Sequence, residues 1–485
     1  MNNLYNFLEK NEKLKLQILT FLEADSNQYF PMATLMEELG LSRFKLVNYV
    51  NDINVDLGEL AAAGKVKLEI VNSNFLTAVD LTDSIIANLR ITYIERSNRF
   101  LYFQELMYQN ISIYDFSEKQ FVSESKAYVI QQDLLKIIKP YKLTIKNGQL
   151  IGEEADIRIT YFMLYYFFFN GIKYPFSETE IVEAMYRAIC EAFSLELPPT
   201  QEVKLRFFIA ITCLRIAEGN YILGEPNHQA ASESQEEIIY AIASTFFKED
   251  ESVLRVESQY LLAFLIAENY ITIDKSYYAK LENKVTERLS QQFITLFCEK
   301  ITGDFSIDSK QLEENLLLLE DEISRIHFKL LHFNLYPDVF ATRGQIKYFQ
   351  EVYPEYFEVI EAFLNSYIDK TNIIVDRAAL FYDYMFAIVT TFPIQLLQRK
   401  IHICIDFSRG TTYSNYIAHN IFQFQPMNII LDMVPSGNTD LYISDFELAE
   451  INCEQLIWKE PPMIRDWKNL GNLLVKIRER KSNEK

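Results

Sequence analysis

The first 152 residues contain one order of elements twice, and this internal repeat limits what the chain can fold into more than any other feature. In the first copy, a helix is expected from Lys13 to Ala24, followed by a short helix from Met32 to Leu39 that Gly40 ends. Ser42 then caps a third helix that runs to about Leu57. This outline is typical of a helix-turn-helix, and the hairpin predicted from Lys65 to Val79 is its wing.

The second copy lies between Thr82 and Gly152. Its wing gives the strongest hairpin signal in the chain, because an Asn147-Gly148 turn separates two short apolar stretches. Its long helix ends at Pro140, which lacks a backbone donor. The expected segments are helices at 83–96 and 99–109, a short helix at 116–121, a long helix at 125–139 and a hairpin at 141–151.

The long helix of each unit is the candidate recognition helix. Ser, Lys and Tyr near a helix N-terminus can contact phosphate, and Gln can bond a purine edge in the major groove. In the second helix we assign four apolar residues to the core: Val129, Ile130, Leu134 and Leu135. The candidate DNA contacts of the first unit are Ser42, Arg43, Lys45, Asn48, Tyr49, Asn51, Lys65 and Lys67. Those of the second unit are Ser123, Ser125, Lys126, Tyr128, Gln131, Gln132, Lys136, Lys142 and Lys146.

Two alternatives stay open for these units. Winged helices also serve as protein-interaction modules. Few arginines lie on the two helices, so a mode that reads DNA bend or groove shape is compatible with them.

The charge distribution favours DNA contact only in the N-terminal third. The chain has a net charge of −20, and residues 1–150 hold 16 Lys and Arg against 18 Asp and Glu, a net of −2. The remaining 335 residues therefore carry −18, which would repel a duplex. We interpret that remainder as a regulatory or self-associating body, and a homodimer or larger homo-oligomer would double the phosphate contacts.

The rest of the chain predicts a mainly α, multidomain protein. Gly and Pro number only 13 each, and amphipathic helices joined by short polar loops fill 153–392. The apolar run from Ile159 to Asn170 is shorter than the roughly 20 residues that span a bilayer, so we expect a buried helix and no membrane contact. After Pro393 three short apolar strands and two helices predict a small α/β domain.

The sequence FVSESKAYVIQQDLLKIIKPYKLTIKNGQLIGEE at Phe121–Glu154 resembles the Mga and AtxA family of regulators from Gram-positive bacteria. The resemblance implies two helix-turn-helix units, two helical domains of the phosphotransferase-regulated type (PRD) and a C-terminal domain similar to a phosphotransferase IIB subunit. Family members self-associate and activate or repress promoters, often of virulence or metabolic genes. The expected domains are 1–80, 81–152, 153–290, 291–395 and 396–485.

Two helical segments are similar to PRD domains. These are EVYPEYFEVIEAF at Glu351–Phe363 and ESQYLLAF at Glu257–Phe264. Where the family pattern has phosphorylatable histidines, this chain has Phe208, Phe264 and Phe386, and phenylalanine cannot accept a phosphoryl group. His228, His327 and His332 remain candidates for phosphorylation, although we favour packing roles for the last two and a solvated loop for the first.

The segment IHICIDFSRGTTYSNYIAHNI at Ile401–Ile421 is similar to the strand, phosphate loop and helix of IIB subunits. Such a loop would bind phosphate through backbone amides at a helix N-terminus, beside a nucleophilic cysteine. Gly410 and Ser414 match the loop, but Phe407 stands in the place of the cysteine and Cys404 falls within the strand. The resemblance therefore implies an association role for this domain.

Other function classes find little support in the sequence. No catalytic motif or zinc-ligand spacing stands out, so no enzyme activity, metal or cofactor is expected, and the five cysteines are typical of buried thiols in the cytoplasm. The expected partners are double-stranded DNA, a second copy of the chain, RNA polymerase and phosphotransferase proteins. The alternatives are an RNA-binding antiterminator, disfavoured because such proteins begin with a β-rich domain, and a sugar-system phosphocarrier or interaction protein.

Overall fold

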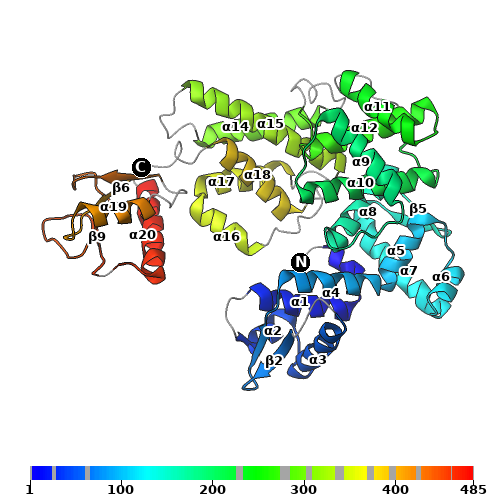
Figure 1. The fold of residues 1–485 in the computed structure, drawn as a ribbon, viewed down its shortest axis with the longest axis horizontal. Helices are drawn as coiled ribbons and strands as arrows, with labels where there is room; N and C mark the ends of the chain where they lie inside the picture. Colours follow the sequence, from blue (N-terminus) through cyan, green and yellow to red (C-terminus); the bar gives the residue numbers. More distant parts are fainter. Residues whose placement is uncertain are drawn as a thin grey trace. The chain divides into compact units, whose positions relative to one another are not determined.

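The structure of the chain is a computed structural model that describes residues 3–24, 29–60, 66–224, 233–272, 284–301, 309–333, 343–368, 376–392, 400–421, 428–459 and 461–483. It has two compact units, Met1–Tyr277 and Tyr278–Lys485 (Figure 1). Helices predominate in both units, which confirms the mainly α class. Lys65 and His228, both candidate site residues, lie outside the described residues.

The first winged unit follows the predicted order closely. This unit begins with η1 and ends with an antiparallel hairpin. The turn residues of the hairpin, Asn72 and Ser73, adopt left-handed φ of 48° and 60°. The two-residue strand β1 pairs with β3 and was not predicted, because two residues give no alternation to detect. The elements are η1 (Asn3–Phe7), α1 (Lys10–Ala24), β1 (Phe30–Pro31), α2 (Met32–Leu39), α3 (Arg43–Glu59), β2 (Lys67–Val71) and β3 (Phe75–Val79).

The second winged unit repeats that order after two helices. Its short helix starts at Ile113 rather than at 116, because the Ser112 hydroxyl accepts a hydrogen bond from the Asp115 amide and caps it. In its wing, Asn147 and Gly148 have φ of 51° and 75°, as the predicted turn requires. The elements are α4 (Asp83–Glu95), α5 (Asn98–Tyr108), α6 (Ile113–Lys119), α7 (Glu124–Ile138), η3 (Lys139–Tyr141), β4 (Thr144–Lys146) and β5 (Gln149–Ile151).

A buried polar cluster joins the two winged units. Asp56 of α3 accepts hydrogen bonds from Lys15 Nζ of α1 and from the Tyr93 hydroxyl of α4, each at 2.7 Å. Burial, together with the bond to Asp56, raises the pKa of Tyr93, so the phenol stays protonated and donates. The first unit is thus attached to α4, the helix that opens the second.

Among the residues that the structure describes, five further helices complete the first compact unit. The apolar run predicted as a buried helix belongs to α8, and Phe162 and Phe168 on it are fully buried. Phe208 of α10 and Phe264 of α12, which stand at the histidine positions of the PRD pattern, stack with ring centroids 3.6 Å apart in the same core. These helices are α8 (Glu154–Phe169), α9 (Thr179–Phe193), α10 (Pro199–Ala217), α11 (Glu233–Phe246) and α12 (Glu251–Ala267).

The second compact unit begins with a helical bundle around one hydrophobic core. Its helix α14 was not named from the sequence, and the predicted domain boundary at 290/291 falls within it. The structure places the whole of α14 against α15 and α17 in this unit. The elements are α14 (Val285–Ile301), α15 (Ser309–Phe333), α16 (Arg343–Val352), α17 (Pro354–Phe363), the π-helical turn η4 (Leu364–Ile368) and α18 (Arg377–Thr391).

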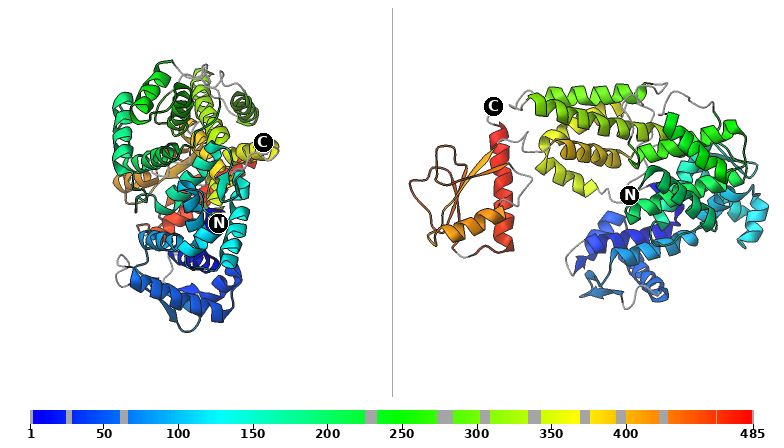
Figure 2. Two further views of the ribbon diagram at one scale, coloured as in Figure 1. Left: turned by 90° about the vertical axis from the view of Figure 1, so that its right-hand side faces the viewer. Right: turned by 45° about the horizontal axis from the view of Figure 1, so that its top comes forward.

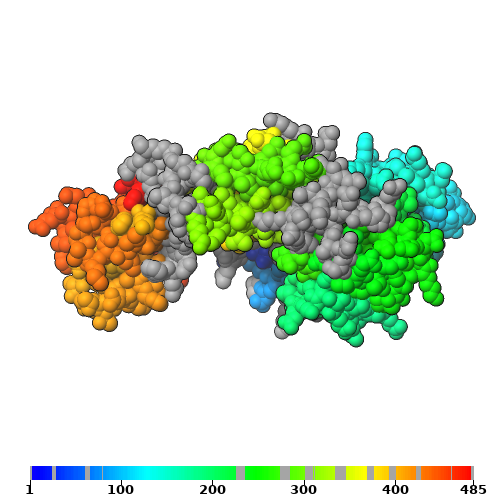
Figure 3. Space-filling model, turned by 90° about the horizontal axis from the view of Figure 1, so that it is seen from above, coloured from blue at the N-terminus to red at the C-terminus, as the bar shows by residue number. Residues whose placement is uncertain are grey.

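The unit ends with a parallel sheet of order β7-β6-β8-β9, whose strands are drawn in orange in Figure 1, and Figure 3 shows the surface of this part of the chain, also mainly in orange. Ile403 and Leu441 point from the sheet into a core with Ile417 of α19 and Leu474 of α20, and α20 runs alongside the sheet (Figure 2, right). The last strand, β9, was not predicted. The elements are β6 (Ile401–Ile405), α19 (Thr411–Ile421), β7 (Ile429–Asp432), β8 (Leu441–Ser444), β9 (Glu454–Ile457) and α20 (Ile464–Asn483).

Candidate nucleic-acid interface

The first recognition helix, α3, starts as predicted. Ser42 has an extended backbone, and its hydroxyl accepts a hydrogen bond from the Lys45 amide at 3.4 Å. Lys45, Asn48 and Asn51 are exposed along the helix. These side chains can reach phosphates or base edges without breaking a contact to the fold.

Two other predicted contacts of α3 have structural partners. Arg43 Nη2 donates to the Ser73 carbonyl and so joins the helix N-terminus to the wing turn. The Tyr49 hydroxyl donates to Asn11 Oδ1 of α1 at 3.0 Å, and its ring is half-buried. Both residues position the helix and the wing relative to the rest of the unit.

The second recognition helix, α7, begins at Glu124, so Ser123 is its cap and Ser125 lies inside the first turn. The Ser123 hydroxyl accepts from the Lys126 amide at 3.3 Å. Ser125, Lys126 and Tyr128 are exposed, as predicted for a helix that approaches DNA.

Gln131 and Val129 exchange their expected roles. Gln131 Nε2 donates to the Tyr102 hydroxyl of α5 at 2.8 Å, which binds its amide to the fold rather than presenting it to a base. Val129, predicted as core, is 52% exposed. Lys136 is exposed but forms an ion pair with Asp133 at 3.1 Å, and Gln132 is half-buried.

The reason for this exchange is visible when the two helices are compared from their caps. Ser42 and Ser123 are equivalent, Lys45 and Lys126 follow each at the same distance, and buried Leu46 matches buried Ala127. Continuing along both helices places Gln131 opposite Val50, a buried position. The match with Val50 of the first unit therefore indicates, from the repeat in the sequence, that Gln131 faces the core.

The wings carry exposed lysines beside the helices. Lys67 starts β2 with its Nζ 3.9 Å from Glu69, and Lys142 Nζ lies 3.9 Å from Asp156. Lys146 is exposed at the end of β4, where it pairs in register with Gln149. At these separations the carboxylates leave the ammonium groups open to a phosphate.

Two exposed aromatic residues near the recognition helices were not predicted. Phe44 in the first turn of α3 is 75% exposed, and Phe121 in the turn before α7 is 97% exposed with a left-handed φ of 55°. An exposed large apolar side chain is unfavourable in water, and at Phe121 the left-handed backbone is unfavourable as well, so stability of the fold does not explain these two residues. Apolar contact with a thymine methyl group is one use for such a ring.

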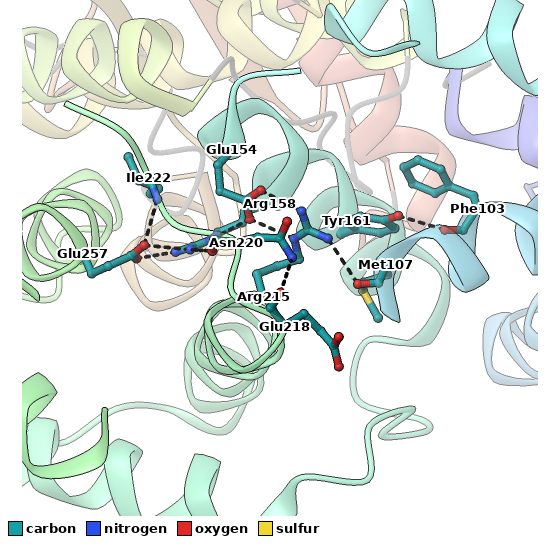
Figure 4. A network of polar contacts seen from close by, with 10 residues as sticks. All are labelled: Phe103, Met107, Glu154, Arg158, Tyr161, Arg215, Glu218, Asn220, Ile222 and Glu257. Carbon is teal, nitrogen blue, oxygen red and sulfur yellow. Dashed lines mark hydrogen bonds and ion pairs between the residues drawn. The ribbon is translucent and has the colours of Figure 1, made fainter. Parts of the chain in front are cut away.

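A buried ion-pair network underlies the second winged unit (Figure 4). Arg158 of α8, which is 1% exposed, donates to both Glu257 oxygens, one at 2.8 Å, and its Nε donates to Glu154 at 3.0 Å. Arg215 of α10 bonds the same Glu154 and donates from Nη1 to the Met107 carbonyl of α5 at 3.2 Å. The network therefore links α8, α10 and α12 to a helix of the second winged unit.

Of the candidate phosphorylation residues of the second unit, His327 lies in the core and His332 is exposed. His327 is fully buried, with Nδ1 bonded to Ser290 Oγ at 2.9 Å and Nε2 to the Tyr384 hydroxyl at 2.8 Å. Burial lowers its pKa to about 3. His332 is exposed, its Nδ1 lies 2.9 Å from the Phe328 carbonyl, and partial desolvation of the ring lowers its pKa. Neither nitrogen of His327 is open to a phosphoryl donor.

The loop after β6 has no thiol to carry a phosphoryl group. Phe407 is buried at the position considered for a cysteine, and its amide donates to Ser414 Oγ at 3.2 Å. The Ser408 amide and hydroxyl both donate to Asp445, which lowers the pKa of that carboxylate. Cys404 is fully buried in β6, and burial raises its thiol pKa to about 11. A carboxylate thus occupies the donors that would bind a phosphate.

Other reactive groups form no metal site and no disulfide in the residues that the structure describes. In this part of the chain no three His, Cys, Asp or Glu residues lie so as to hold a metal ion, and all five cysteines are free thiols. Within the same part of the chain, no helix is both long and apolar enough to cross a membrane.

Comparison with known families identifies the second winged unit. Residues 83–165 match the family model described as the Mga helix-turn-helix domain. The match starts at α4, contains α7 and the second wing, and ends within α8. No curated protein matches the chain. The resemblance drawn from Phe121–Glu154 is therefore confirmed over this segment: the second winged unit matches the Mga helix-turn-helix domain, which is consistent with a Mga-like regulator.

Proposed function

We propose that the protein is a sequence-selective, double-stranded DNA-binding transcription regulator that acts by binding rather than by catalysis. The observation that carries this proposal is the repeated recognition helix, in which Ser42 and Ser123 cap two helices that each expose a lysine three residues later. The Mga helix-turn-helix match over the second copy supports the same function. A lysine in a first helical turn beside a wing lysine suits phosphate contact on both sides of a groove.

Substituting both exposed lysines tests this proposal. The Lys45→Ala, Lys126→Ala variant should bind duplex DNA about tenfold more weakly near physiological salt, and the slope of log affinity against log salt should fall by about 2. Fluorescence anisotropy with a labelled duplex at several salt concentrations measures both quantities. Lys310→Ala, on α15, is the matched control because its side chain is 82% exposed in the acidic body. An unchanged salt slope in the double variant would show that these helices do not contact phosphates.

We propose that the helical segments regulate DNA binding without phosphorylation. The stacked Phe208 and Phe264 rings and the closed environment of His327 support this view. The Glu154–Arg158–Arg215 network gives a physical connection from these helices to the second winged unit. A PRD-like ancestry for the helical segments and contacts with RNA polymerase belong to this same proposal.

Self-association through the C-terminal domain completes the proposal. The parallel order of its sheet is compatible with the IIB-like fold, and exposed apolar residues follow the carboxyl ends of the strands. Met433 follows β7 and is 98% exposed, Phe446 follows β8 at 51%, and Ile464 begins α20 at 90%. Carboxyl ends of parallel strands share one edge, so Met433 and Phe446 lie at the same edge of the sheet, where exposed apolar side chains suit a second copy.

The Met433→Glu, Ile464→Glu variant should convert dimers to monomers. Two carboxylates in a dimer interface would be desolvated without partners, which should raise the dissociation constant about tenfold or more. Sedimentation velocity at several protein concentrations measures the change, with Leu223→Glu, an 85% exposed residue of the first compact unit, as the control. An oligomeric state equal to that of the wild type would place the association surface elsewhere.

A further inference from the structure

A basic hollow of about 460 Å³ lies where the first winged unit meets the second recognition helix. Its walls come from η1 and α1, from α5, and from the C-terminal half of α7 with the turn that follows. All of these belong to the first compact unit. The hollow is separate from the exposed N-terminal turn of α7 that the proposed function uses.

Four cationic side chains line the hollow: Lys10, Lys13, Arg99 and Lys136. Asp133 is the acidic residue among the lining, 3.1 Å from Lys136 Nζ and 3.5 Å from Arg99 Nη2. Asp133, together with Glu9 at 3.9 Å from Arg99, supplies two negative charges against the four positive charges. The hollow therefore has a positive potential in a protein whose net charge is −20.

Two of the cations are held in place by the fold. Arg99 has a side chain only 20% exposed, and its Nη1 donates to the Leu8 carbonyl at 2.6 Å. Lys13 Nζ donates to Asn6 Oδ1 at 2.7 Å. Burial and the nearby Arg99 charge lower the pKa of Lys13.

The hollow also has an apolar wall formed by Leu8, Ile137, Pro140 and Tyr141. Small-molecule pockets typically measure about 300–1,000 Å³ and combine apolar walls with a few charged groups. Guanidinium and ammonium groups around one opening suit a phosphate, while an apolar wall suits the carbon skeleton that bears it.

We propose that this hollow binds the phosphate of a small phosphorylated solute and thereby places a ligand against the second recognition helix. The same chemistry would accept a backbone phosphate of DNA, and the experiment separates these two sources. Lys136 and Ile137 of α7 line the hollow, so an occupant contacts the helix that carries Lys126 at its other end.

Phosphorus NMR on the full chain tests the proposal directly. Inorganic phosphate and ribose 5-phosphate, titrated separately, should show saturable line broadening, and the sugar phosphate should bind more tightly because it also covers the apolar wall. In the Lys13→Gln, Lys136→Gln variant both dissociation constants should rise about tenfold. The control is Lys310→Gln, Lys347→Gln, which removes the same charge from side chains that are 82% and 80% exposed in the second compact unit and should keep wild-type binding.

A second variant tests the site in the opposite direction. Asp133→Asn removes the carboxylate that competes for Arg99 and Lys136, so phosphate should bind several-fold more tightly. Absence of saturable broadening in the wild type, or equal weakening in the hollow and control variants, would overturn the proposal. Circular dichroism confirms that each variant is folded.

A duplex arm identifies the source of the phosphate. If ribose 5-phosphate stays bound when a roughly 20-base-pair duplex is added at about 100 mM salt, the occupant is a solute. If the duplex displaces ribose 5-phosphate, and the salt slope of duplex binding falls by about 1 in the hollow variant, the occupant is the DNA backbone. Both results support a phosphate site. If the chain binds no duplex, the proposed function is contradicted. The phosphate site is then tested by the phosphate titration by itself.

Discussion

Replacing Arg158 with alanine is expected to lower the free energy of unfolding of the first compact unit by about 3–5 kcal/mol. Arg158 is 1% exposed, and Glu257, whose side chain is 2% exposed, has both oxygens bonded to it. Without the guanidinium, Glu257 keeps, among the described residues, the Ile222 amide as its one donor to Oε1. A buried carboxylate without its cation is costly, whereas the pair itself adds little net stability.

Two spectroscopic signals separate the units in this experiment. Both tryptophans, Trp458 and Trp467, lie in the second compact unit, so their fluorescence should keep its wild-type urea midpoint. Circular dichroism at 222 nm should show an earlier transition from the helices of the first unit.

Two control variants test the cause of this destabilisation. The Arg158→Met, Glu257→Leu variant should recover most of the loss because it leaves no buried charge unpaired. Arg187→Ala, at a pair whose Arg is 70% exposed, should cost no more than about 1 kcal/mol. A loss below about 1 kcal/mol in Arg158→Ala would show that the network does not stabilise this unit.

Acid should destabilise the second unit through His327. Burial holds its folded pKa at about 3, below the ordinary value of 6.5, so the unfolded chain binds more protons between these values. Stability is therefore complete above pH 6.5 and is lost as the pH falls toward 3, at about 1.4 kcal/mol per pH unit. Between pH 6.5 and pH 5 the wild type should lose about 2 kcal/mol more than His327→Gln.

Urea unfolding followed by circular dichroism at the two pH values measures this difference. Hydrogen exchange of peptides from α14 and α15 locates it, because Ser290 and His327 lie on these helices. His419→Gln changes an exposed histidine of the same unit and should leave the acid loss in place. The same acid loss in the wild type and in His327→Gln would mean that the ring is protonated in the folded unit.

The sequence predicted elements whose signals are local. Ser42 and Ser123 precede apolar runs and cap helices in the structure, and the Asn147-Gly148 turn forms where its backbone preference requires it. The short strands β1 and β9 escaped prediction because two to four residues hold too little periodicity.

Features that depend on distant partners were not predictable. The bond between Gln131 and Tyr102 and the pairing of Arg158 with Glu257, 99 residues away, depend on tertiary packing. The same holds for the exposure of Val129, because the buried face of α7 is narrower than its apolar residues indicate. His327 shows the limit most clearly, because its two hydrogen-bond partners come from α14 and α18.

The most direct test of the central claim compares duplex DNA with single-stranded RNA of equal length on the full chain. Mobility-shift titrations on random genomic fragments at about 50 and 200 mM salt give the affinity and its salt dependence. We expect duplex binding that exceeds RNA binding, weakens at least about tenfold between the two salts, and is lost when Lys45 and Lys126 are both changed to glutamate. Binding to RNA in preference to the duplex, or no duplex binding at the lower salt, would contradict this claim.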